Sequence, residues 1–77
     1  MFVFSVILEG EDDAGRYFVT FDVSALDADR AGKLAMAEAE RRGLRIVGLE
    51  ECAQSENQAS VIGIIKTYGK SYFGSEP

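Results

Sequence analysis

The sequence predicts a small α+β domain with the element order ββαββ: a four-stranded antiparallel sheet, in the order 2-1-3-4, with one helix packed on one face. Three observations support this fold class. Four segments have the apolar patterns of strands, one long helix-forming segment separates the second strand from the third, and short polar stretches separate the rest. The 77 residues suffice for one domain. We expect it to span residues 1–68, followed by a partly ordered tail over residues 69–77.

The first strand, residues 2–8, carries bulky apolar residues on both faces. Because side chains alternate along a strand, Val3 and Ile7 point away from the larger apolar set of Phe2, Phe4, Val6 and Leu8. A strand that is apolar on both sides belongs in the interior of a sheet. Residues 9–15 are acidic and glycine-containing, which predicts a turn into a second, half-buried strand over residues 16–23.

The helix is predicted over residues 28–42, which are rich in strong helix formers. Asp27 is the better N-cap, with Ser24 as the alternative one turn earlier, and Gly43 suits the left-handed position after the helix. The inward stripe is mostly alanine at three- and four-residue spacing: Ala28, Ala31, Leu34, Ala35 and Ala39.

The third strand is expected over residues 44–50, a polar connection over 51–59, and the fourth strand over 60–68. The helix is then a crossover that makes the second and third strands parallel. Such crossovers usually skip a strand, and the first strand fits the gap because it is antiparallel to both. This gives the order 2-1-3-4.

One helix is too narrow to cover this sheet. Four strands span about 19 Å, whereas a helix with its side chains is about 10–12 Å wide. Val3 and Ile7 would therefore lie on an uncovered face. An uncovered apolar patch usually marks an interface, so we expect these two residues to face a second copy of the chain or another partner.

The residue types needed for catalysis or metal binding are scarce. The chain has no histidine and one cysteine, Cys52, whose pKa the neighbouring Glu50 and Glu51 are expected to raise. The acidic turn lacks the spacing of a calcium-binding loop. We therefore predict no catalytic residue, no metal site and no cofactor, and we expect that the protein is not an enzyme.

Thirteen acidic and eight basic residues give a net charge of −5. This charge repels nucleic acid and attracts a basic protein surface, so the expected partner is a basic or nucleic-acid-binding protein, alongside a homodimer. No stretch approaches the ~20 apolar residues of a membrane helix, and no signal-peptide pattern is seen, so we expect a cytoplasmic protein with no membrane contact. The carboxylates expected to bind the partner are Glu9, Glu11, Asp12, Asp13, Asp22, Glu50 and Glu51.

In size, acidity and layout the chain resembles the small phage inhibitors called anti-CRISPR proteins. That resemblance implies an inhibitor that occupies a basic nucleic-acid-binding surface, and it assigns no role to any residue. The pattern from Tyr17 to Gly43 is also similar to HicB-type antitoxins, although their extra strand before the helix is missing. An antitoxin or immunity protein, and a homodimeric structural or regulatory domain, remain as alternatives.

Overall fold

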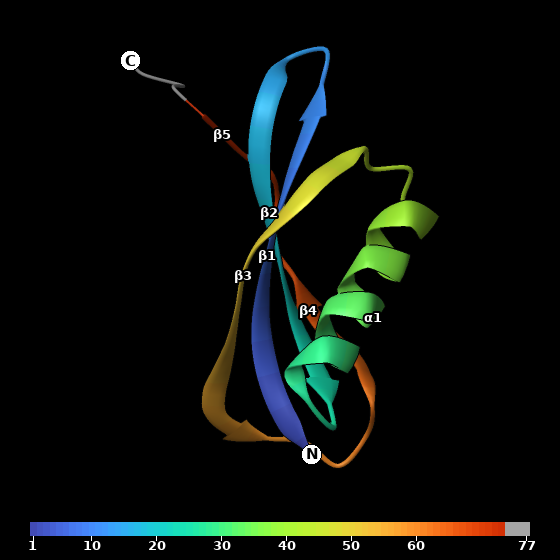
Figure 1. Cartoon of the computed structure of the whole chain (residues 1–77), viewed down its shortest axis with the longest axis vertical. Helices are drawn as coiled ribbons and strands as arrows, with labels where there is room; N and C mark the ends of the chain where they lie inside the picture. The colour runs from blue at the N-terminus through green and yellow to red at the C-terminus, as the bar shows by residue number, and fades with distance from the viewer. Residues whose placement is uncertain (74–77) are drawn as a thin grey trace.

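The computed structural model describes residues 1–73 and confirms an α+β fold with the layout ββαββ (Figure 1). One helix lies on one side of a strongly twisted antiparallel sheet, and the first hairpin extends beyond the C-terminal end of that helix. Residues 74–77 of the expected tail lie outside the described part of the chain. The elements are β1 (Phe2–Asp12), β2 (Gly15–Ala25), α1 (Ala28–Arg41), β3 (Ile46–Gln58), β4 (Gly63–Thr67) and β5 (Ser71–Tyr72).

The strand order is β3-β1-β2-β4, and β5 also pairs with β2. The prediction that β1 lies between β2 and β3 is confirmed. The predicted place of the fourth strand is wrong, because β4 pairs with β2 rather than with β3. Beside β2, Ile64 of β4 lies opposite Val23 and packs against the hydrophobic core. The connection from β3 to β4 is long enough to cross from one edge of the sheet to the other. Three strand spacings are about 14 Å, and the five Cα steps from Gln58 to Gly63 span up to ~17 Å.

The strands are longer than the sequence patterns indicate. β1 and β2 pair without interruption until Asp12 lies opposite Gly15, so most of the predicted turn is strand. The predicted polar connection over residues 51–59 is also wrong, because β3 continues to Gln58 along β1. Polar side chains suit this stretch, since β3 is an edge strand and most of its residues are exposed to water.

The core lies between α1 and the β1–β2 pair. Val6 and Leu8 of β1 and Phe21 of β2 have no exposed surface. The helix meets them with an alanine face, and these alanines are also fully buried: Ala31, Ala35 and Ala39. Small side chains let the helix axis approach the sheet closely, so α1 covers the two central strands.

The predicted helix ends are confirmed. The Asp27 carboxylate accepts a hydrogen bond of 2.8 Å from the Arg30 amide, as an N-cap does. Gly43, just after the helix, has a φ of 75°, the left-handed conformation that favours glycine. In the last turn, Arg41 and then Arg42 hydrogen-bond to Glu38 and lower the pKa of that carboxyl to about 2.

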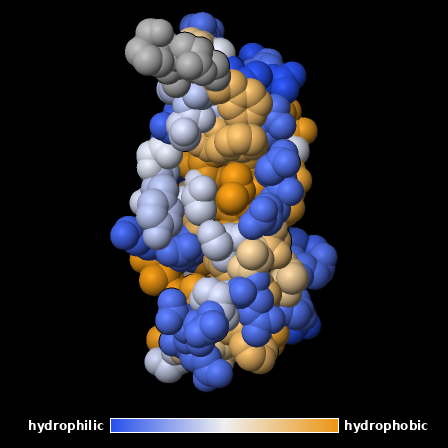
Figure 2. Space-filling model, turned by 90° about the vertical axis from the view of Figure 1, so that its left-hand side faces the viewer, coloured by the Kyte–Doolittle hydropathy of each residue, from blue (hydrophilic) through white to orange (hydrophobic). Residues whose placement is uncertain are grey.

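The face of the sheet turned away from α1 is less open and less apolar than predicted. Val3 is only 8% exposed, and Ile7 is half-buried. The residues paired with Ile7 are Thr20 and Glu51, which are polar. Figure 2 shows this side, where apolar groups run down the middle between polar borders.

The chain covers part of this face itself. The Phe73 ring, just after β5, packs on the ring of Phe18 with 4.4 Å between centroids. The Tyr68 hydroxyl donates a hydrogen bond to Asp22 at 2.9 Å. Val3, farther along β1 and opposite Ser24, is itself buried, so it offers little surface to a second copy or a partner. The expectation that Val3 lies on an uncovered face is corrected.

Gly10 is the strand position where a side chain fits least. A Cβ atom there would lie 2.6 Å from the ring of Tyr17, which is 1% exposed and cannot move away easily. We expect Gly10→Ala to lower the free energy of unfolding in urea by ~1–3 kcal/mol. Gly48→Ala is the matched control, because a Cβ atom there meets nothing within 4 Å. Equal stability of the two variants would contradict this packing.

Candidate protein-binding edge and groove

The acidic residues of the first hairpin are paired with the protein's own cations. Arg16 contacts Glu9 at 2.5 Å and Glu11 at 2.8 Å, and Arg45 contacts Glu11 at 3.3 Å. The bonds to Glu11 and then Glu9 raise the pKa of Arg16. These two predicted binding carboxylates are thus partly neutralised inside the chain, which weakens their attraction for a basic partner.

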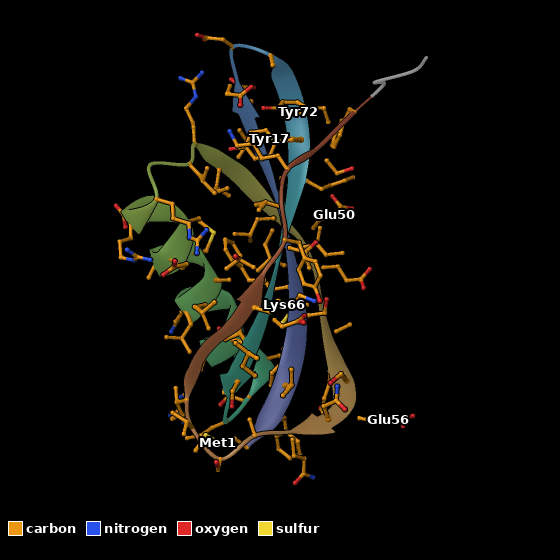
Figure 3. All side chains as sticks on the ribbon, turned by 180° about the vertical axis from the view of Figure 1, so that it is seen from behind. Met1, Tyr17, Glu50, Glu56, Lys66 and Tyr72 are labelled. Carbon is orange, nitrogen blue, oxygen red and sulfur yellow. The ribbon has the colours of Figure 1, made fainter. Side chains whose placement is uncertain are left out.

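Asp12 anchors the C-terminal segment to the hairpin. Its carboxylate accepts hydrogen bonds from Lys70 at 2.8 Å and from the Tyr72 hydroxyl at 2.6 Å. These two bonds, with Lys70 the larger contribution, lower its pKa from 3.8 to about 2. The Tyr72 ring also packs edge-to-face on Tyr17, with 5.5 Å between centroids (Figure 3). Asp12 therefore has a structural role.

The remaining predicted carboxylates lie in different places. Asp13 is exposed at the hairpin turn, and Asp22 accepts the bond from Tyr68 on the face turned away from α1. Glu50 and Glu51 are exposed on β3. The structure thus does not gather the seven predicted residues into one site.

β3 carries carboxylates that no cation in the described part of the chain neutralises. Within residues 1–73, Glu50, Glu51 and Glu56 form no ion pair, and β3 itself contains no lysine or arginine. Figure 3 shows Glu50 and Glu56 on the same side of the molecule, along β3. Glu56 was missed in the sequence because its segment was assigned to a connection.

The outer edge of β3, which is the backbone edge turned away from β1, is open. β3 ends the strand order and pairs only with β1 in the part of the chain that the structure describes. In an antiparallel edge strand, about half of the backbone N–H and C=O groups point outward without a strand partner. We call this feature the β3 edge, and it comprises Ile46–Gln58.

An apolar groove lies between α1 and the first part of β3. It has a volume of about 690 Å³, and two of its apolar lining residues are substantially exposed, Met36 at 41% and Leu49 at 49%. The groove also has a glycine in its helix wall, since a Cβ atom on Gly32 would come within 3.2 Å of Leu49. The apolar residues that line this α1–β3 groove are Ala28, Gly32, Met36, Ala37, Leu44, Ile46 and Leu49.

The sequence contained a partial signal for the groove. Met36 lies off the alanine stripe of the helix, and Leu49 belongs to a strand with apolar groups on both faces. Neither pattern places the two residues together, because that requires knowing which strand edge the helix overhangs.

Cys52 is a half-buried thiol on β3. It donates a weak hydrogen bond to the Ala28 carbonyl at 3.6 Å. Burial raises its pKa, so the predicted direction is right, but the cause is burial rather than the neighbouring carboxylates. Within residues 1–73, no three Cys, Asp or Glu side chains are grouped so that they could hold a metal ion. No helix in that range is both long enough and apolar enough to cross a membrane.

Comparison with known proteins does not extend these observations. No protein-family model, curated protein or solved structure matches the chain.

We expect the anchor at Asp12 to fail in acid. Because the folded protein lowers the pKa of Asp12, the ionised carboxylate stabilises the anchored segment fully at a pH above the ordinary pKa of 3.8. This stabilisation is lost as the pH falls from 3.8 towards about 2. The measurement is an NMR titration that follows the Phe73 amide, which donates to the Arg16 carbonyl at 2.9 Å.

The Phe73 signal should move away from its folded position over this pH range. In Asp12→Asn it should be displaced at neutral pH and insensitive to acid, whereas Asp13→Asn should behave like the unchanged protein. A Phe73 signal in Asp12→Asn identical to that of the unchanged protein would show that Asp12 does not hold this segment.

Proposed function

We propose that this chain is an acidic inhibitor that binds another protein and blocks its basic nucleic-acid-binding surface. The observation that carries the proposal is the row of carboxylates on β3, which no cation within residues 1–73 neutralises. A strand with this charge attracts lysine- and arginine-rich surfaces and repels nucleic acid itself.

The arrangement of charge indicates which part of the surface the partner contacts. The hairpin carboxylates Glu9, Glu11 and Asp12 are engaged with Arg16, Arg45 and Lys70. The net charge of −5 is therefore least compensated along β3. We propose that the partner contacts Glu50 and Glu51, and that the hairpin serves mainly as a rigid support.

Binding is a better account of this chain than catalysis. The thiol of Cys52 has a raised pKa, which makes it a poor nucleophile at neutral pH. The α1–β3 groove offers apolar surface beside the acidic strand, which is the combination of anchor and rim that protein interfaces use.

The test is competition with nucleic acid. Immobilised protein is exposed to a nuclease-treated bacterial lysate in low salt, and retained proteins are eluted with increasing salt. We expect a basic nucleic-acid-binding protein that is released as the ionic strength rises. Its purified form should lose nucleic-acid binding when this chain is added.

A pair of charge reversals locates the contact. Glu50→Lys should weaken the competition by about fivefold or more, because one attraction becomes a repulsion. Asp13→Lys makes the same charge change at the hairpin turn and should have less than a twofold effect. A captured protein that still binds its nucleic acid in the presence of saturating chain would contradict the proposed inhibition.

A further inference from the structure

We propose that the β3 edge pairs in antiparallel orientation with an extended segment of the partner protein. The C-terminal half of that segment is apolar and enters the α1–β3 groove, and its N-terminal half carries lysine or arginine residues opposite the carboxylates of β3. This inference rests on the proposed function, because it specifies how the partner is held.

The backbone of β3 supplies the first requirement. Its 13 residues form an edge strand with no partner on the outer side within the described residues. Extended peptides bind such edges by adding a strand, with main-chain hydrogen bonds providing affinity and side-chain pockets providing specificity.

The groove supplies a pocket at the correct place. It lies between α1 and the first part of β3, so side chains on the helix side of an added strand would point into it. Leu49 and Met36 are about half exposed there and would be covered by apolar residues of the segment. In Figure 1, β3 starts near the C-terminal end of α1 and then runs away from the helix.

The part of β3 that follows Leu49, its last groove-lining residue, supplies the charge. Glu50, Glu51 and Glu56 lie there, and none of them forms an ion pair within residues 1–73. Among residues 1–73, Lys33 is the one cation that lines the groove, and it is paired with Asp29 at 3.1 Å. Glu40 adds another carboxylate to the lining. An opposing strand that places lysine or arginine beside these carboxylates gains favourable cross-strand pairs.

The same charges argue against a second copy of the chain as the occupant. Two β3 strands side by side would bring six carboxylates together with no cation on either strand. Like charges across a strand pair are destabilising, and acidic side chains on an edge commonly prevent self-pairing.

The order of the segment follows from strand direction. β3 runs from its groove end at Ile46 to its acidic end at Gln58. Antiparallel pairs are more stable and outnumber parallel pairs about two- to threefold. An antiparallel segment must therefore be basic first and apolar second.

The experiment uses two synthetic twelve-residue peptides of identical composition. One has lysine alternating with threonine in its first half and valine alternating with leucine in its second half, and the other has the reversed sequence. Affinity is measured by calorimetry at low salt, and the contact is mapped by NMR amide shifts. We expect the basic-first peptide to bind about tenfold tighter than its reverse. Its shifts should fall on Ile46–Gln58 and not on the turn at Asp13.

Protein variants test the two halves of the site separately. Glu50→Lys and Leu49→Ala should each lower the affinity for the basic-first peptide by about fivefold. The controls are Asp13→Lys, with the same charge change, and Val61→Ala, at a residue that is 73% exposed outside the groove. Each control should leave the affinity within about twofold.

Equal affinity of the two peptides, or shifts outside β3 and the groove, would overturn the inference. So would sedimentation that shows a dimer unable to bind either peptide. If neither peptide binds while Glu50→Lys still weakens the competition with nucleic acid, the strand pairing is wrong and the proposed function stands. Loss of both results would remove both proposals.

Discussion

The close contact between the alanine face of α1 and the β1–β2 pair determines the rest of the architecture. Ala31, Ala35 and Ala39 are fully buried against the core, so the helix lies low over the two central strands. A helix placed there contacts β4 on one side, where Ile64 completes the core. On the other side it reaches only the first part of β3, which leaves the α1–β3 groove and an open strand edge.

The distribution of charge follows the same division. Where the hairpin extends beyond the helix, its carboxylates form ion pairs with Arg16, with Arg45 and with Lys70 of the C-terminal segment. Along β3 the carboxylates remain available, beside unpaired backbone groups and exposed apolar surface. Surface ion pairs contribute little stability individually, but here they determine which acidic residues keep an uncompensated charge.

The sequence predicted the parts of the fold that depend on local patterns. The two-sided apolar pattern of residues 2–8 placed β1 inside the sheet, and Asp27 and Gly43 set the helix ends. The place of β4 was not predictable, because both edges of the sheet accept an apolar strand. The length of β3 and the groove were missed for a related reason: a polar edge strand resembles a loop, and no periodicity shows which edge a helix overhangs.

Hydrogen exchange along β3 tests most directly whether this strand is an open edge. If it is, amides of Ile46–Gln58 that point towards β1 exchange slowly and those that point outward exchange fast, in alternation interrupted only at the bulges. This pattern should be independent of protein concentration. Uniform protection of all β3 amides, or protection that increases with concentration, would show that the edge is already covered and would contradict the account.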